Sequence, residues 1–337
     1  FNGAAHETFE KSSLACVGLA DGQQSPIGNN VTCALGVKAD GDPRKEDRRV
    51  MRAIRHFLEN WIIPPGYSRL ARGARNYYVG RWGRSGEDRR LLSKTRLLEG
   101  RHGPDGRCFI LGAGSSIASQ DLSKLAGEPV ISVSNTFVHP LFARIRPKYH
   151  VVPHMKYGHG HHYADSDFVK WLREMEEATA GVEMFFHIGD RALIEGHGLF
   201  RGHAIHWIDH CPWNGDMRTP IDLARVPPIW SVSELALTIA IYLGYEKIYL
   251  LGIDHDWFNG PLVYFYDPQR QHAMRPDAQA LIAAGVDAEY QMRRHADIFR
   301  KYKYLYAIRK NVFNANANPH HYLDVFPKVD FDSLFRK

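Results

Sequence analysis

Short apolar runs alternate with stretches of helical periodicity over the last two thirds of the chain. The runs lie at residues 108–111, 130–133, 149–152, 182–186, 247–251 and 312–315. Residues 168–178, 231–243 and 277–310 carry apolar side chains at helical spacing between or after these runs. Strands that alternate with helices predict an α/β fold with a mostly parallel sheet and helices on both faces.

The first hundred residues lack this alternation. Residues 1–43 are rich in Gly, Asn, Ser and Asp without a sustained period, which predicts an irregular or poorly ordered segment. Residues 44–105 combine helical spacing with arginines interleaved among tyrosines and tryptophans, which predicts a basic helical appendage. Such a segment can bind single-stranded nucleic acid or an anionic membrane. A solvated appendage that packs its aromatics on the main domain, 106–337, is the favoured interpretation, because no recognised nucleic-acid module occurs.

The composition of the chain narrows the partners and the compartment that we expect. Lys and Arg outnumber Asp and Glu by 43 to 37, and the pI of about 9.0 suits anionic partners such as nucleotides. The four cysteines are scattered without a CxxC pair, which predicts reduced thiols and a cytoplasmic protein. The chain has no apolar run long enough to predict a membrane span, so contact with the inner face of a membrane would be peripheral.

The turn after the run at 108–111 is rich in glycine and reads Gly112-Ala113-Gly114-Ser115-Ser116. Glycine lets a backbone approach an anion, and Ser115 and Ser116 can cap a following helix whose first N–H groups favour negative charge. The turn predicts a phosphate site, with an ordinary tight turn as the alternative. The turn does not fit a dinucleotide-binding fingerprint, because Ile117 and Asn135 stand where that fingerprint needs a glycine and an acid. No GxxxxGKS/T loop occurs in the sequence, which argues against a P-loop nucleotidase.

Residues 229–257 predict a buried helix followed by a buried strand. Ser231 and Glu234 form a capping-box pattern before the helix, and the strand at 247–251 leads to Asp254-His255-Asp256. Buried acids at the carboxyl edge of a sheet are costly unless a ligand, a metal or a hydrogen-bond network needs them. The DxD pattern makes Asp254 and Asp256 candidate ligands for Mg²⁺ or Mn²⁺ beside a sugar-nucleotide diphosphate.

Two other stretches are rich in histidine. Residues 154–162 read HMKYGHGHH, and residues 204–213 read AIHWIDHCPW. The first is broken by glycine and lacks an acid or a cysteine at the usual spacing, so it is not expected to bind zinc. The second is interpreted as a pocket wall or, equally well, as an edge of the core.

The glycine turn and the later helix–strand stretch together resemble one group of transferases. ILGAGSSI, residues 110–117, resembles the IxGxGPSL turn of the bacterial sialyltransferases of glycosyltransferase family 42. It equally resembles the turn of the motility-associated, flagellin-modifying glycosyltransferases and of the archaeal 6-hydroxymethylpterin diphosphokinase. SVSELALTIAIYLGYEKIYLLGIDHDW is similar to a second signature of this group, and LDVFPKVDFDSLF resembles the tail of its cell-surface polysaccharide members. The resemblance covers residues 107–335 and implies a Rossmann-like domain of the GT-A type.

The resemblance implies a nucleotide-sugar donor at the carboxyl edge of the sheet. Positions that match the donor-binding pattern of the group are Gly112, Ala113, Gly114, Ser115, Ser116, Asn135, His154 and Ser231. Two departures put CMP-sialic acid itself in doubt: Ser115 replaces a proline, and Trp230-Ser231-Val232 replaces the Thr-Ser-Gly of the sialyltransferases. The donor could carry a sialic-acid-like or another acidic sugar.

The implied reaction displaces a nucleoside phosphate from the anomeric carbon by an acceptor hydroxyl, which requires a general base and donors to the leaving phosphate. In the sialyltransferases a histidine after the second signature is the base, and His295 is the nearest match, with His255 and His272 as alternatives. Asp254 and Asp256 complete the candidate catalytic set. The candidates to neutralise the leaving phosphate are Arg293, Arg294, Tyr264 and Tyr266.

The predicted function is the transfer of a sugar from a nucleotide sugar to a hydroxyl of a cell-surface glycan, a lipid-linked saccharide or a protein. An ATP-dependent diphosphokinase of the 6-hydroxymethylpterin type, with Mg²⁺ on Asp254 or Asp256, stays open as an alternative. A non-catalytic nucleotide- or RNA-binding protein that uses residues 44–105 is the third hypothesis, and nucleic acid is the less expected partner. The arginine-rich segment and the polysaccharide-type tail favour the glycosyltransferase.

Overall fold

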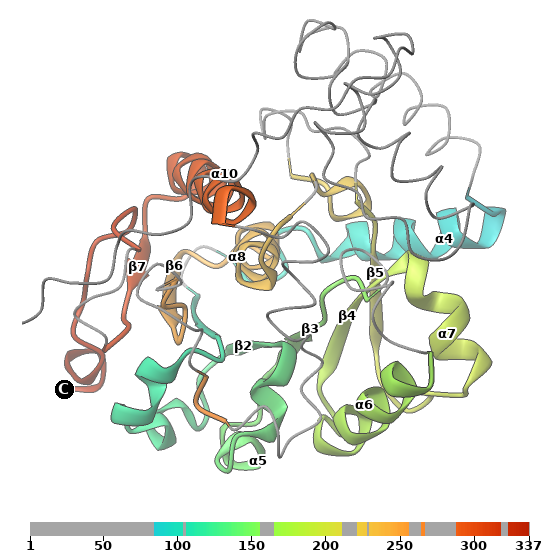
Figure 1. Cartoon of the computed structure of the whole chain (residues 1–337), viewed down its shortest axis with the longest axis horizontal. Helices are drawn as coiled ribbons and strands as arrows, with labels where there is room; N and C mark the ends of the chain where they lie inside the picture. The colour runs from blue at the N-terminus through green and yellow to red at the C-terminus, as the bar shows by residue number, and fades with distance from the viewer. Residues whose placement is uncertain are drawn as a thin grey trace, which may run out of the picture. The chain divides into compact units, whose positions relative to one another are not determined.

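Seven parallel strands form one sheet in the computed structural model (Figure 1). The strands are β1 Arg107–Leu111, β2 Val130–Val133, β3 Tyr149–Val151, β4 Glu183–His187, β5 Ile205–Ile208, β6 Lys247–Leu251 and β7 Val312–Asn314. Their order is β5-β4-β3-β2-β1-β6-β7. The structure describes residues 84–103, 106–155, 165–210, 221–227, 229–255, 264–266, 288–317 and 323–336, all within the unit Pro65–Lys337.

The predicted α/β fold with a parallel sheet is confirmed. Six of the strands lie at the apolar runs of the sequence, with ends that differ by no more than one residue. β5 is the exception, because the sequence interpretation of residues 204–213 was a pocket wall or a core edge rather than a strand. β5 pairs in parallel register with β4, with Phe186 opposite Trp207.

Helices cover both faces of the sheet (Figure 1). The α-helices are α4 Gly86–Thr95, α5 Phe142–Ile145, α6 Asp165–Ala178, α7 Arg191–Gly196, α8 Val232–Tyr242 and α10 Ala288–Ile308. Successive side chains of a strand point to opposite faces. Cys108 and Ile110 of β1 therefore pack with α8 and α10, while Phe109 and Leu111 pack with Ile117 and the short turns that follow β1.

The chain that follows the glycine turn differs from the prediction. It forms two 3-10 turns, η3 Ser115–Ser119 and η4 Leu122–Leu125, instead of a helix capped by Ser115 and Ser116. Gln120 is extended between them, and Asp121 accepts the Ser123 N–H, which starts a new turn. Ser and Asp side chains compete in this way with helix formation. The predicted helix dipole at the glycine turn is therefore absent. The other 3-10 helices are η2 Arg96–Leu98, η5 Ser134–Val138, η6 Ile188–Asp190, η7 Leu223–Arg225 and η9 Asp332–Phe335.

α8 is buried on all sides, as expected for an apolar helix inside an α/β domain. Gly244, at φ +89°, ends it in the left-handed conformation that favours glycine. The predicted cap of α8 by the Ser231 hydroxyl is absent, because this hydroxyl pairs with Ser233. Glu234 accepts the N–H of Trp230, the residue before the N-cap, at 3.3 Å.

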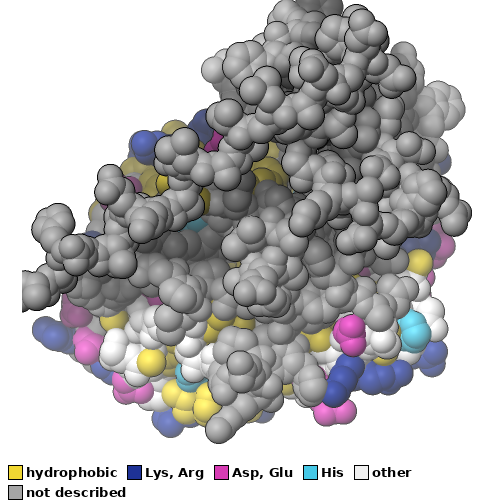
Figure 2. Space-filling model, viewed as in Figure 1, with side chains coloured by type: hydrophobic (Ala, Val, Ile, Leu, Met, Phe, Trp, Pro, Cys, Tyr) yellow, Lys and Arg dark blue, Asp and Glu magenta, His cyan; other side chains and the backbone are white. Residues whose placement is uncertain are grey.

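The described end of the predicted basic segment packs on the sheet. α4 begins with a capping box between Ser85 and Asp88, and Thr95 Oγ1 donates to Trp207 O in β5 at 2.8 Å. The predictions for residues 1–43 and for 44–83 lie outside the described residues. On the visible rim of the described part, acidic and basic side chains are interspersed (Figure 2).

The C-terminal tail docks on the core. Leu323 and Phe326 are buried in the core beside α10, and Phe335 stacks on Phe109 of β1 at 5.7 Å between ring centroids. Cys108 is buried with a free thiol, whereas Cys16, Cys33 and Cys211 lie outside the described residues. Among the described helices, none has both the length and the apolar character needed to cross a bilayer.

Candidate functional site

The strand order reverses between β1 and β6. The chain leaves β1 toward β2 on one side, and it leaves β6 toward β7 on the other side. Ligands of open parallel sheets bind beyond the carboxyl ends of the strands at such a reversal, because the two loops diverge there. The glycine turn follows β1 and the Asp254 turn follows β6, so the structure brings the two predicted stretches together at this point.

The two turns are in direct contact. Gly114 N–H donates to Gly252 O at 2.8 Å, and Ser116 N–H donates to Asp254 Oδ2 at 3.0 Å. A Cβ atom on Gly112 would lie 2.9 Å from the Gly252 carbonyl carbon, so this approach requires glycine. Asp254 is 4% exposed, and it places a carboxylate where the sequence predicted a phosphate. An anion that binds at this turn would lie close to the negative charge of Asp254.

The segment 264–266 lies along the glycine turn. Gly114 and Tyr264 form an antiparallel bridge, and the rings of Tyr264 and Tyr266 stack 5.1 Å apart. Asn135 Nδ2 donates to the Tyr266 hydroxyl at 2.9 Å, while Asn135 Oδ1 accepts from Trp171 Nε1 at 2.7 Å. The predicted site residues Asn135, Tyr264 and Tyr266 thus belong to one assembly at the end of β1 and β2.

A chain of polar side chains connects His255 to the start of α8. His255 Nε2 pairs with the Tyr302 hydroxyl at 2.9 Å, and this hydroxyl pairs with Ser233 Oγ at 2.8 Å. Ser233 in turn pairs with Ser231, which joins this predicted site residue to His255. The backbone of His255 has φ +48°, an uncommon value for a residue with a side chain.

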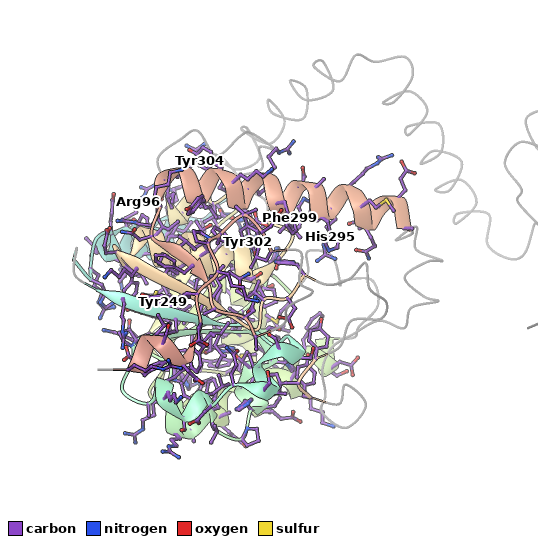
Figure 3. All side chains as sticks on the ribbon, turned by 90° about the vertical axis from the view of Figure 1, so that its left-hand side faces the viewer. Arg96, Tyr249, His295, Phe299, Tyr302 and Tyr304 are labelled. Atoms are coloured by element: carbon purple, nitrogen blue, oxygen red, sulfur yellow. The ribbon has the colours of Figure 1, made fainter. Side chains whose placement is uncertain are left out.

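His295 lies on the face of α10 that is turned toward the sheet, together with Phe299 and Tyr302 (Figure 3). Its ring stands edge to face with the ring of His255 at 6.4 Å. His295 Nδ1 lies 2.7 Å from Gln291 O, and because a carbonyl oxygen only accepts, Nδ1 carries the proton and Nε2 the lone pair. Burial lowers the pKa of His295 below its ordinary value, so the ring is a neutral base near pH 7.

The two candidate arginines have different surroundings. Arg294 Nη2 donates to Trp230 O at 2.6 Å, and burial lowers its pKa while Tyr290 and Tyr264 act in the opposite direction. The side chain of Arg293 is 66% exposed and pairs with Glu289 on the same helix. The structure thus brings Arg294, but not Arg293, toward Tyr264.

A buried ion pair supports this end of α8. Glu234 is fully buried, and its Oε1 lies 3.1 Å from Lys301 Nζ of α10. Burial raises the pKa of Glu234 to about 7, although Lys301 and the Trp230 N–H both act to lower it. The pair fixes α8 against the helix that carries His295.

His154 follows β3 and lies in a cluster with two other histidines. Its ring stacks on His187 at 3.7 Å between centroids, and His187 stacks on His210 at 4.6 Å. Burial lowers the pKa of His187 and, with repulsion from His187, lowers that of His210 to about 3. Both rings are therefore neutral at ordinary pH. Asp256 and His272 lie outside the described residues.

Sequence reasoning missed several of these residues. The sequence around Tyr302 and Ser233 contains no pattern that indicates a functional site. A tyrosine on an apolar helix face usually belongs to the core. His187, the last residue of β4, was passed over because it stands alone in the sequence and not in a motif. A search for polar residues at the end of every predicted strand would have found His187 beside His154.

Comparison with known protein families and with curated proteins gives no match for this chain. The site is therefore characterised by its own geometry.

Proposed function

We propose that the protein is a glycosyltransferase that uses a nucleotide sugar bound at the carboxyl ends of β1 and β6. The observation that carries the proposal is the direct contact of the Gly112–Ser116 turn with the Gly252–Asp254 turn at the reversal of strand order. In this proposal the sheet belongs to a Rossmann-like fold of the GT-A type, and the basic segment predicted at residues 44–105 takes part in binding the acceptor or an anionic membrane.

The donor nucleotide is assigned to the turn that ends β1. Ser116 Oγ is buried and has no hydrogen-bond partner among the described residues, so it is a free group for a ligand oxygen. The stacked rings of Tyr264 and Tyr266 lie beside the same turn. Asp254 takes part either by holding Mg²⁺ or Mn²⁺ against the donor phosphates or by accepting a hydrogen bond from a donor hydroxyl.

The chemistry is a displacement at the anomeric carbon. The acceptor oxygen forms the new bond to this carbon, and its proton passes to His295 Nε2. The bond from the anomeric carbon to the phosphate oxygen breaks, and its electron pair leaves with the nucleoside phosphate. Arg294, close to Tyr264 and partly desolvated, is placed to stabilise the charge that develops on the leaving phosphate.

The proposal is tested by the binding of nucleotides to the full chain. Thermal shift and calorimetry with CMP, UDP, GDP and ATP, each with Mg²⁺, with Mn²⁺ or with EDTA, separate the alternatives. Binding of a nucleotide and of its sugar conjugate supports the glycosyltransferase. Binding of ATP with Mg²⁺ alone would instead indicate a diphosphokinase, and a response only to an oligonucleotide would indicate an RNA-binding protein.

Ser116→Ala locates the bound nucleotide. It removes the free hydroxyl and should weaken binding about fivefold to tenfold, as expected for one lost hydrogen bond. Ser119→Ala is the matched control, because Ser119 is exposed on the same 3-10 turn and bonds only to Ser116 O among the contacts described. Equal affinities of the two variants would place the nucleotide elsewhere.

A further inference from the structure

We propose that His154, His187 and His210 form a binding site for a divalent cation of the zinc class. One ring nitrogen from each of these three residues lies within 4.8 Å of the others. Neutral imidazole is a preferred ligand of Zn²⁺, and three histidines are a donor set that holds zinc with a fourth position open. The proposal is independent of the glycosyltransferase activity and concerns a different part of the sheet edge.

Three neighbouring strands deliver the three rings. His154 follows β3, His187 is the last residue of β4, and His210 follows β5. Because β3, β4 and β5 are adjacent and parallel, their carboxyl ends lie side by side. The sheet holds His187 directly, His154 lies three residues beyond the end of β3, and His210 is held by a bridge to Val226.

Two buried carboxylates orient the histidines. Asp209 Oδ1 lies 3.3 Å from His187 Nε2, and Asp190 Oδ1 lies 3.5 Å from His154 Nε2. Metal-binding histidines commonly hydrogen-bond through the second ring nitrogen to a carboxylate, which sets the tautomer. Asp209 is also held by two hydrogen bonds from Arg84, at 2.9 and 2.6 Å, so it suits the outer shell rather than direct coordination.

Gly189 leaves space beside two of the rings. A Cβ atom at this position would lie 2.9 Å from His187 Nδ1 and 3.0 Å from His154 Nε2. Gly189 N–H donates to His187 Nδ1 at 3.0 Å, and His210 N–H donates to His187 Nε2 at 3.2 Å. A cation at Nδ1 would replace the hydrogen bond from Gly189. The site therefore needs a residue without a side chain at position 189.

The rings must rotate to bind. They stack with interplanar angles of 24° and 25°, so the in-plane lone pairs of neighbouring rings lie in nearly parallel planes. Coordination at the usual zinc–nitrogen distance of about 2.0–2.1 Å requires the lone pairs to converge on one point. The competing interpretation is a packed stack of neutral imidazoles without a ligand, and it predicts that added metal leaves the protein unchanged.

The test uses the full chain purified without a histidine tag, which would itself bind zinc. Zn²⁺ is titrated by calorimetry and in competition with a chromophoric chelator, and Co²⁺ is titrated by its visible absorption bands. We expect one high-affinity ion per chain and Co²⁺ bands typical of four- or five-fold coordination. Failure of the wild-type protein to bind either ion with a Kd below about 100 μM would overturn the proposal.

Variants locate the ion. His187→Gln should lower the affinity about 100-fold or more, and Gly189→Ala should lower it at least about tenfold while all three ligands are kept. His206→Gln is the control, since His206 lies on the neighbouring strand, β5, but pairs with Glu183 at 2.7 Å. Wild-type affinity in both His187→Gln and Gly189→Ala, or a loss equal to that of the control, would contradict the assignment.

Discussion

Gly114 and Asp254 lie in contact across the ends of two neighbouring strands: a Cβ atom on Gly114 would lie 2.8 Å from Asp254 Cγ and 2.8 Å from Gly252 O. Gly114→Ala must therefore push the two turns apart. We expect a loss of about 1–3 kcal/mol in the free energy of unfolding, measured by urea denaturation, because overpacking costs this much in tight sites. Nucleotide binding should weaken in the same variant.

The control for this change is Gly86→Ala. Apart from its chain neighbours and the backbone of its own helix, no atom of the described residues lies within 4 Å of the position that its Cβ would take, at the start of α4. Alanine restricts the unfolded chain, so this variant should be unchanged or more stable by up to about 1 kcal/mol. Equal destabilisation by both substitutions would show that the turn contact has no special role.

His295→Gln tests the assignment of the base. Removal of a general base lowers turnover about 10²–10⁴-fold while the affinity for nucleotide stays within about twofold. The measurement is kcat with the nucleotide sugar that the binding screen identifies. His197→Gln, which replaces an exposed histidine at the end of α7, should leave kcat unchanged. An unchanged kcat in His295→Gln would assign the base to another residue.

The pH dependence of kcat/KM gives an independent test of the same residue. The base acts in its neutral form, and burial lowers the pKa of His295 below the ordinary histidine value of about 6.5. The activity should therefore persist at pH 6.5 and fall only at lower pH, as the imidazole becomes protonated. An acid limb centred above pH 6.5 would contradict this assignment.

Lys301→Met should destabilise the protein in a pH-dependent way. The substitution leaves the Glu234 carboxylate buried without its cation, which costs about 3 kcal/mol when the carboxylate is charged. The pKa of Glu234 is about 7 with Lys301 present, and it rises further without it. Unfolding in urea should therefore show a larger loss at pH 8 than at pH 5, where Glu234 is protonated. Lys303→Met, at an exposed position of α10, is the control.

Because of the buried His150, the free energy of unfolding should decrease as the pH falls. Burial lowers its pKa to about 3, whereas an exposed histidine has an ordinary pKa of about 6.5. Between these values the unfolded chain binds a proton that the folded chain does not, so stability is full above pH 6.5 and is lost as the pH falls. The slope is about 1.4 kcal/mol per pH unit for this group.

Two variants isolate this contribution. His150→Gln should reduce the slope of the free energy of unfolding between pH 6 and pH 4 by about that amount. Ser132→Ala removes the hydrogen bond to His150 Nδ1 but keeps the imidazole, so it should keep the slope while it lowers the overall stability. Identical slopes in the wild type and in His150→Gln would contradict the prediction.

The sequence predicted most of the strands, because a strand that is buried on both faces of a sheet appears in the sequence as a continuous apolar run. Cys108 to Leu111 and Lys247 to Leu251 were placed correctly for that reason, and they face each other in register in the sheet. β5 was missed because Ile205 and His206 are half-buried at the sheet edge, where the alternation with polar residues resembles a loop.

The site was predictable only in part. Strand ends converge by topology, so the meeting of Gly114 with Asp254 followed from the parallel order. The His154–His187–His210 cluster did not, because its members are separated by 33 and 23 positions in the sequence and only the sheet brings them together. The role of Asp254 as the acceptor of the Ser116 N–H depends on a side-chain rotamer, which a sequence pattern does not specify.

His255 occupies a left-handed backbone conformation at φ +48°. For a residue with a Cβ atom this geometry costs roughly 1 kcal/mol, and glycine or asparagine would adopt it with less strain. Other residues could thus form the bend at the end of β6 with less strain. The strained backbone of His255 places its imidazole against the Tyr302 hydroxyl, and backbone strain of this kind commonly accompanies a functional contact.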